Sequence, residues 1–258
     1  MGIVNVTPDS FSDGGQFSTT NAAVAHAMRL AEEGADILDI GGESTRPNAT
    51  PVGLQQELDR VIPVIEALAK QINIPISIDT YKPQVMQAAI AAGVSMVNDV
   101  RALQEDGALA IVAKSDVGVC LMHMQGTPQT MQENPHYENV VSEVKAFLAD
   151  RLRATMNRTN GHAGLKAERV VLDPGFGFGK TREHNISLIQ NLESLTELGQ
   201  PLLVGLSRKS VLGGDNADAR LYASIAAAVI AAQKGAKILR VHDVKATVEA
   251  LKVISAIL

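Results

Sequence analysis

The sequence predicts an α/β protein of the (β/α)8 or TIM barrel class, folded as a single domain over residues 1–258. Three observations predict this fold. Eight short β-branched runs recur along the chain, the segments between them have helical periodicity, and no linker or low-complexity tract divides the sequence.

The strand candidates fall at residues 3–6, 36–40, 74–79, 95–100, 117–123, 169–173, 201–207 and 237–242. Their starts are 33, 38, 21, 22, 52, 32 and 36 residues apart, which suits a strand plus a helix and is too long for hairpins. Most are apolar on both faces, as is typical of parallel strands covered by helices. A doubly wound open sheet is the alternative architecture.

Glycines punctuate the predicted helices. Gly34, Gly93, Gly199 and Gly235 each close an Ala- or Leu-rich stretch just before a strand, where a left-handed residue commonly ends a helix. The segment 223–232 is apolar nearly all round, so we expect a helix buried against the sheet or partly in a subunit interface.

Composition excludes several classes of protein. Five Phe, three Tyr and no Trp disfavour an aromatic nucleic-acid platform. A net charge of −5 gives no sign of a nucleic-acid or anionic-membrane surface. The only cysteine, Cys120, fits a reducing compartment. No apolar run reaches the roughly 18 residues of a spanning helix, and residues 1–6 lack a signal-peptide pattern, so we expect a cytoplasmic protein with no membrane partner.

Polar residues follow the predicted strands, and in a barrel all these strand ends meet at one rim, where active sites are built. They are Asn5, Asp79, Asn98, His123, Asp173, Ser207, Arg240 and His242. Each has a simpler explanation when taken alone: Asp79 could cap the helix that starts near Pro83, and Asn98 could lie in a turn.

The last two strands predict an anionic ligand. The sequence Ser207-Arg208-Lys209-Ser210 follows the seventh strand, and Arg240 and His242 point to the same side of the eighth. Barrel enzymes commonly bind phosphate here. A solvated basic turn is the alternative for 207–209.

The segment DPGFGFGK at 173–180 resembles a nucleotide loop but matches neither template. A P-loop requires glycine where Pro174 stands, and the dinucleotide fingerprint requires glycine where Lys180 stands. We expect instead a glycine-rich rim loop that brings Phe176 or Phe178 near a ligand, with Asp173 at its base.

Asp79, Asp173 and Asn98 suit a flat heterocycle that presents several N–H donors on one edge. The two aspartates could instead act as acid and base or hold a metal. The six histidines lack the spacing of zinc ligands. Two glycine-rich segments, 7–15 and 41–48, are candidates for lids over the substrate.

Five segments together resemble the bacterial dihydropteroate synthases of the pterin-binding family: 5–15 (NVTPDSFSDGG), 41–47, 173–180, 207–210 and 240–243. The resemblance runs from Met1 to the C-terminus. It implies a transferase of folate biosynthesis that joins 6-hydroxymethyl-7,8-dihydropterin diphosphate to 4-aminobenzoate and releases diphosphate, with Mg²⁺ as cofactor and a homodimer as the assembly.

The resemblance also implies roles for individual residues, with Lys209, Arg240, His242 and Asp79 as the catalytic set. The expected contacts are Asp79, Asn98, Asp173 and Lys209 with the pterin, on which Met122 packs; Asn5 with magnesium; Arg240 and His242, with Thr45 or Arg46 nearby, with the diphosphate; and Phe11, Pro47, Phe178 and Ser207 with the aminobenzoate, where sulfonamides compete in this family.

Some positions depart from the family pattern: Asn48 and Ala223 stand where glycine is common, and Met1 lies almost at the first strand, whereas relatives usually carry a further N-terminal segment. Two rival functions share these residues. A methyltransferase of the pterin-binding superfamily would use the Asp79, Asn98 and Asp173 edge but not the basic cluster. A non-catalytic paralogue that binds pterin or a partner would be free to lose Asn5, Arg46, Lys209 and His242, all of which are present here.

Overall fold

The computed structural model describes residues 1–7, 16–45, 49–157 and 164–257. Its strands are β1 (Gly2–Asn5), β2 (Leu38–Gly41), β3 (Ile76–Asp79), β4 (Met96–Asp99), β5 (Gly118–Met122), β6 (Val170–Asp173), β7 (Leu202–Val204) and β8 (Ala236–Leu239). They form one sheet in sequential order, and every neighbouring pair is parallel. The predicted number, order and direction of the strands are therefore confirmed, and a doubly wound sheet, whose strand order reverses, does not fit.

The sheet curls so that its last strand approaches its first. A parallel bridge joins Gly2 to Val241, just after β8. The Val241 N–H donates to the carbonyl of Met1 at 2.9 Å, and the Ile3 N–H donates to the carbonyl of Val241 at 3.0 Å. Residues at the ends of β8 and β2 consequently come within reach of one another.

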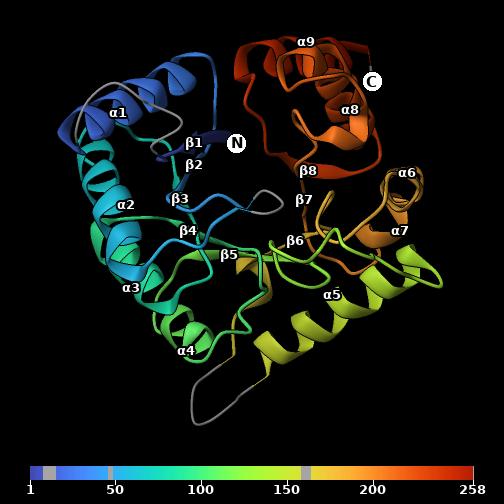
Figure 1. Ribbon diagram of the computed structural model, residues 1–258, viewed down its shortest axis with the longest axis horizontal. Coiled ribbons are helices and arrows are strands. Elements are labelled where there is room, and N and C mark those ends of the chain that lie inside the picture. Colours follow the sequence, from blue (N-terminus) through green and yellow to red (C-terminus); the bar gives the residue numbers. More distant parts are fainter. Residues whose placement is uncertain (8–15, 46–48, 158–163, 258) are drawn as a thin grey trace.

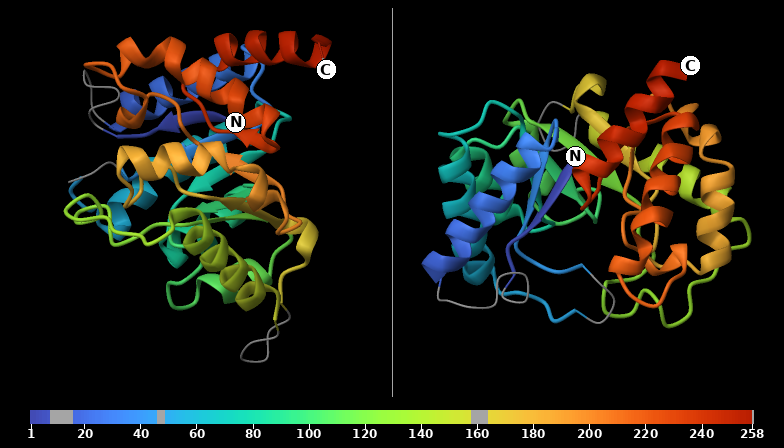
Figure 2. Two further views of the ribbon diagram at one scale, coloured as in Figure 1. Left: turned by 90° about the vertical axis from the view of Figure 1, so that its right-hand side faces the viewer. Right: turned by 90° about the horizontal axis from the view of Figure 1, so that it is seen from above.

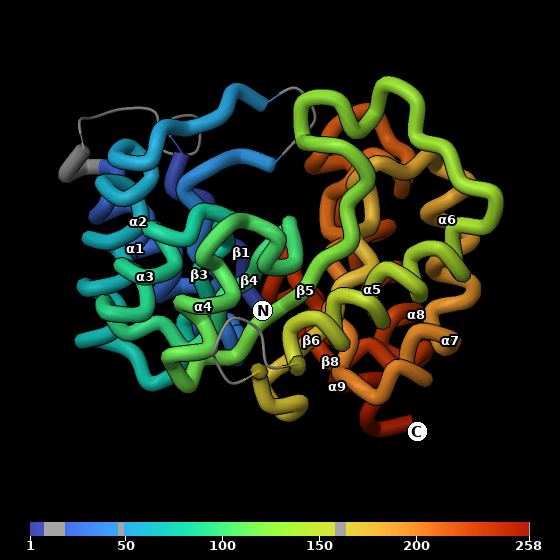
Figure 3. Tube along the Cα trace, turned by 90° about the horizontal axis from the view of Figure 1, so that it is seen from below, coloured from blue at the N-terminus to red at the C-terminus, as the bar shows by residue number. Residues whose placement is uncertain are grey.

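Helices lie outside the strands and follow one another around them in chain order (Figure 1). They are α1 (Gln16–Glu32), α2 (Leu54–Leu68), α3 (Pro83–Ala92), α4 (Ala108–Ala113), α5 (Val140–Met156), α6 (Arg182–Gln190), α7 (Glu193–Thr196), α8 (Leu221–Gln233) and α9 (Val244–Ile257). In the right-hand view of Figure 2, α1 and α2 lie on one side of the strands and α8 and α9 on the other. Figure 3 shows the N-terminus among the strands at the centre of the helices.

The predicted glycine stops are confirmed. Gly34, Gly93, Gly199 and Gly235 have φ between 77° and 107°, a left-handed conformation that glycine adopts without steric cost. The apolar segment 223–232 forms most of α8, which buries Ala227 and Ala231 against the core on one side while Ile230 on the other side is exposed.

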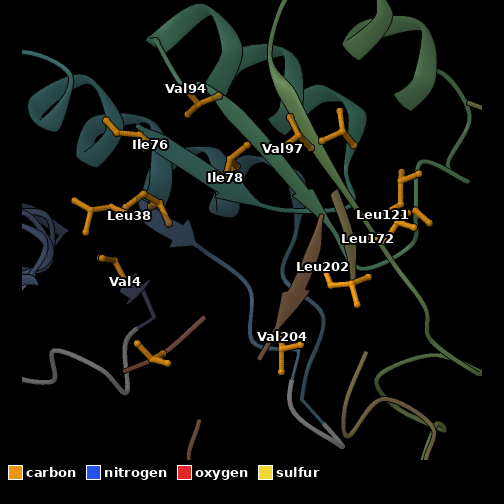
Figure 4. Packing of buried hydrophobic residues seen from close by; sticks show 14 of the residues in the cluster. Val4, Leu38, Ile76, Ile78, Val94, Val97, Leu121, Leu172, Leu202 and Val204 are labelled. Atoms are coloured by element: carbon orange, nitrogen blue, oxygen red, sulfur yellow. The ribbon is translucent and has the colours of Figure 1, made fainter. Parts of the chain in front are cut away.

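Strand alternation divides the core in two. On the outer face, aliphatic side chains from successive strands pack against the helices, among them Leu38, Ile78, Val97, Leu121 and Leu172 (Figure 4). On the inner face, a small separate cluster contains Met1, Met96, Cys120 and Leu203. Because side chains alternate along a strand, the next inward position toward the carboxyl end falls on Asn98, Met122 and Asp173. The polar strand ends thus lie directly above the inner apolar cluster.

None of the helices in the described ranges has the length and apolar character that a bilayer-spanning segment requires.

Candidate active site

Arg240 links three strands at the carboxyl end of the sheet. Its Nε donates to Oδ2 of Asp39 on β2 at 2.6 Å, and its Nη2 donates to Oδ2 of Asp79 on β3 at 2.7 Å. Asp39 is fully buried. Burial raises the pKa of Asp79 to about 7; the Arg240 guanidinium opposes this rise and the negative charge of Asp39 adds to it. Asp79 therefore pairs with a cation rather than capping α3, whose N-cap is Lys82.

Asn98 lies beside this pair, opposite Asp79 in the β3–β4 register. Its Nδ2 donates to Oδ2 of Asp39 at 3.1 Å. The Oδ1 atoms of Asn98 and Asp39 are both buried and have no hydrogen-bond partner among the described residues. A buried acceptor without a partner costs about 1–3 kcal/mol. The base of the site thus holds acceptors that a ligand with N–H donors would satisfy.

Asp173, Lys209 and Phe178 form a second group. Oδ1 of Asp173 accepts the Gly175 N–H at 2.7 Å. Nζ of Lys209 donates to the carbonyl of Phe176 and lies 4.6 Å from the centre of the Phe178 ring. Burial lowers the pKa of Lys209 to about 8, and Asp173 opposes that shift. Burial also raises the pKa of Asp173, opposed by Lys209. Met122, opposite Asp173 in the β5–β6 register, is buried.

Ser207 and His242 hold each other. Oγ of Ser207 lies 3.0 Å from Nδ1 of His242 and accepts the His242 N–H at 3.1 Å. Arg208, although it belongs to the same predicted basic cluster, turns away: its guanidinium binds Asp243, with Nε–Oδ2 at 3.0 Å, and Asp218. Of the predicted basic cluster, the described residues that remain for the site are therefore Lys209, Arg240 and His242.

The end of β1 offers a single amide ligand for a metal. Asn5 is half-buried there. A Cβ added at Gly41 would lie 3.9 Å from Oδ1 of Asn5 and 3.8 Å from Oδ2 of Asp79, so the glycine leaves space between the two oxygens. In the described part of the chain, no three His, Cys, Asp or Glu side chains cluster in a way that could hold a metal ion.

One sequence expectation is corrected, and one alternative left open by the sequence is narrowed. His123 does not face the site: its ring packs edge-on against Phe147 of α5, with centroids 4.9 Å apart, because it follows the inward-facing Met122 and points outward. Phe176 is 1% exposed and belongs to the outer core, so Phe178 is the aromatic residue of this loop that lies near Lys209. Thr45 is half-buried after β2, whereas Phe11, Arg46, Pro47 and Asn48 lie outside the described residues.

Sequence reasoning missed Asp39, which stands inside an apolar strand. Its signal was available: a carboxylate two residues before the strand's end, on the inward side. It also missed Lys82, whose Nζ binds both Glu43 and Glu57 and so ties the segment after β2 to α2 and α3. Arg60 of α2 donates to the carbonyl of Gly42 at 2.7 Å and reinforces the same connection.

Comparison with known proteins gives a consistent result. Residues 1–242 match the family described as pterin binding enzyme. The chain is 52% identical over 256 residues to the dihydropteroate synthase of Haemophilus influenzae, covering 98% of this chain and 91% of that protein. It superposes on the Xanthomonas albilineans dihydropteroate synthase with 4-aminobenzoic acid at a TM-score of 0.92 and 55% identity, covering 100% of this chain and 92% of that one. For the same enzyme in complex with 7,8-dihydropteroate, the TM-score is 0.89 and the identity 52%, with coverage of 100% and 92%.

Proposed function

This chain belongs to the pterin binding enzyme family, among the dihydropteroate synthases, and we propose how its own residues carry out that reaction. It joins 6-hydroxymethyl-7,8-dihydropterin diphosphate to 4-aminobenzoate, forming 7,8-dihydropteroate and releasing diphosphate.

The pterin binds against Asp79, Asn98, Asp173 and Lys209, with Met122 packed on its face. The observation that carries this assignment is the buried, unpartnered Oδ1 of Asn98, beside the equally unpartnered Oδ1 of the fully buried Asp39. The donors on the edge of a pterin would satisfy these acceptors, and analogues lacking the donors would leave them unpaired.

The diphosphate binds Arg240 and His242, with Thr45 or Arg46 nearby. A magnesium ion held by Asn5 fits this site, because Mg²⁺ prefers oxygen ligands and usually keeps only one or two protein ligands beside substrate phosphates and water. When bound, the ion would stabilise negative charge on the leaving group. The space that Gly41 leaves beside Asn5 supports this placement.

The aminobenzoate lies beside Phe178 and Ser207, together with Phe11 and Pro47. Its aromatic amine is a poor nucleophile, so fixed positive charge on the departing diphosphate contributes most to the rate. We expect the diphosphate to leave before the amine attacks, because the dihydropterin ring shares positive charge with its exocyclic methylene. No residue forms a covalent intermediate.

A pterin-dependent methyltransferase is the rival function. It would use the same heterocycle edge but has no need for Lys209, Arg240 and His242 as a cationic group. The 2.6 and 2.7 Å contacts with Asp39 and Asp79 fix the Arg240 guanidinium at this end of the sheet, and Lys209 and His242 add further basic groups there, which supports a diphosphate substrate.

The finer architecture and assembly are part of this proposal. We infer that the sheet is a closed (β/α)8 barrel forming a single domain, which the Gly2–Val241 bridge supports. The active form is a cytoplasmic homodimer. Large exposed apolar residues on α8 and α9, including Tyr222 and Ile257, support self-association.

Diphosphate release from the pterin substrate, measured with and without 4-aminobenzoate and with and without magnesium, tests the assignment. We expect diphosphate release from the pterin substrate to depend on both 4-aminobenzoate and magnesium. A Lys209→Met variant should lose roughly 100-fold or more in kcat/KM, since it removes a preorganised charge. Unchanged kinetics would refute the role of Lys209, and a substrate trapped covalently on the protein would show that a covalent intermediate does form.

A further inference from the structure

The segment between β6 and α6 is pressed against the chain that follows β5. Gly175, Gly177 and Gly179 have φ of +67°, +80° and +62°. A Cβ on Gly175 would lie 1.8 Å from the carbonyl oxygen of His123, and one on Gly179 would lie 2.4 Å from that of Gln125. Gly175 and Gly179 therefore serve a close approach between two backbone segments, whereas a Cβ on Gly177 would meet the Lys209 side chain.

Lys180 is buried at the end of this segment, with 3% of its surface exposed. Its Nζ contacts the carbonyl of Gly175 at 2.9 Å, the carbonyl of Phe178 at 3.0 Å and Nδ1 of His123 at 2.8 Å. An ammonium has three donors. All three are used within the protein, so none remains for a substrate.

His123 supplies the acceptor that completes this arrangement. Its ring is enclosed by Phe147 and Tyr137, with centroids 4.9 and 6.1 Å away. Burial lowers its pKa to about 3, and the neighbouring Lys180 adds to the shift. The imidazole is therefore neutral, and when Lys180 donates to its Nδ1 the ring proton lies on Nε2.

Other side chains secure the remaining polar groups of the loop. Oδ1 of Asn185 accepts the Gly177 N–H at 2.7 Å, Gln132 donates to the Gly177 carbonyl at 2.6 Å, and the Tyr137 hydroxyl donates to the Gly179 carbonyl at 2.8 Å. The loop is thus held by side chains from α6 and from the segment between β5 and α5.

We propose that Lys180, braced by His123, is a positioning residue that fixes the loop 174–179 so that Phe178 and the Phe176 carbonyl aim Lys209 at the substrates. The inference depends on the proposed roles of Lys209 and Phe178. Lys180 acts only through the loop: it joins the carbonyls on either side of Phe176, the residue to which Lys209 is bonded. A lysine in a sequence that resembles a nucleotide loop thus holds backbone instead of phosphate.

The test replaces Lys180 with Met, which keeps the side-chain length and removes the donors. The matched control is Lys145→Met, which removes a partly exposed lysine paired with Glu197 on the surface. We expect Lys180→Met to lose roughly 10- to 100-fold in kcat/KM for 4-aminobenzoate, with a raised KM, because small misplacements at a reacting site have effects of this size. Lys145→Met should match the wild-type protein.

Two His123 variants separate positioning from stability. His123→Asn keeps an acceptor for Lys180 but loses ring packing, so it should lower the melting temperature while KM stays near that of the wild-type protein. His123→Leu removes the acceptor and should raise KM as Lys180→Met does. If Lys180→Met does not fold, His123→Leu carries the same test.

Hydrogen exchange gives a readout that does not depend on turnover. The Phe178 N–H donates to the Gly175 carbonyl at 3.1 Å, and its exchange should accelerate by roughly tenfold or more in Lys180→Met if the loop opens locally. A folded Lys180→Met with wild-type KM and wild-type exchange would overturn the proposal. Faster exchange with normal kinetics in both Lys180→Met and Lys209→Met would instead refute the role of Lys209 in catalysis.

Discussion

Asp39→Asn tests how charge is shared at the centre of the site. One oxygen of Asp39 accepts both Arg240 Nε and Asn98 Nδ2, while the other has no partner among the described residues. An asparagine can place its carbonyl at the shared position, so the geometry survives and only the charge is lost. A hydrogen bond to a charged group contributes about 1.5–3 kcal/mol and a neutral one about 0.5–1.5. We therefore expect the free energy of unfolding to fall by about 1 to 2 kcal/mol at low pH, where Asp79 is protonated. At pH 8, where Asp79 is ionised, the lost repulsion between Asp39 and Asp79 should offset this decrease.

The same substitution should shift the titration of Asp79. The Asp39 charge raises the pKa of Asp79, so its removal, which also leaves Arg240 to Asp79 alone, should lower that pKa by about 1 to 3 units. In the wild-type protein Asp79 titrates near pH 7 instead of its ordinary 3.8. The folded state then binds more protons than the unfolded state between these values, and stability falls as pH rises through that window. Asp39→Asn should flatten this slope.

Calorimetric binding of 6-hydroxymethyl-7,8-dihydropterin between pH 5 and pH 9 measures the shift, because this ligand carries no phosphate that would titrate. Binding to the ionised Asp79 should weaken below about pH 7 in the wild-type protein and only at lower pH in the variant. If the loss of binding at acid pH occurs in Asp39→Asn at the same pH as in the wild-type protein, or at a higher pH, the idea that Asp39 and Asp79 share the Arg240 guanidinium is refuted.

Three further predictions concern packing and burial. Gly175→Ala should lower the free energy of unfolding by more than about 4 kcal/mol in urea titrations. Gly199 has a similar positive φ but open space around it, so Gly199→Ala should lose only about 1 to 2 kcal/mol. Equal losses would show that the close approach of Gly175 to the His123 carbonyl is unimportant. Lys82→Met leaves the carboxylates of the buried Glu57 and the partly buried Glu43 without a cationic partner, so the protein should lose about 3–5 kcal/mol of stability. Lys234→Met, at a more exposed pair, should lose less than about 1 kcal/mol, and comparable losses would contradict the anchoring role of Lys82. Cys120, fully buried with its thiol pKa raised mainly by burial, should resist iodoacetamide until urea unfolds the protein; labelling of the native protein would contradict its burial.

Much of the fold could be predicted from the sequence because it depends on local patterns. Strand spacing and glycine stops predict eight strands in order. Asp79, Asn98 and Arg240 occupy inward-facing positions at the carboxyl ends of their strands, so they meet at one end of the sheet. Strand ends shifted by a few residues: the seventh run was expected over 201–207, yet β7 ends at Val204, because the chain beyond it turns to seat Ser207 beside His242.

The sequence could not predict which group each charged side chain contacts. Asp39 and Arg240 are 201 residues apart, and only the closing of the sheet brings them together. His123 lies at the end of a strand as the site residues do, but it follows the inward-facing Met122, so its side chain points outward. Arg208 and Lys209 are adjacent, yet Arg208 pairs with Asp243 while Lys209 contacts the Phe176 carbonyl. In each case the outcome depends on contacts between segments that are distant in sequence.

The alternation of the strands also predicts which sequence changes this fold can accept over evolutionary time. Aliphatic residues on the outer face can exchange for others of similar volume without disturbing the charged groups. Inserting or deleting one residue within β2, β3 or β4 would do the opposite, because it would turn Asp39, Asp79 or Asn98 toward the helices and an aliphatic residue toward the ligand. Relatives should therefore differ freely in the identity of outward residues while the spacing within each strand stays constant.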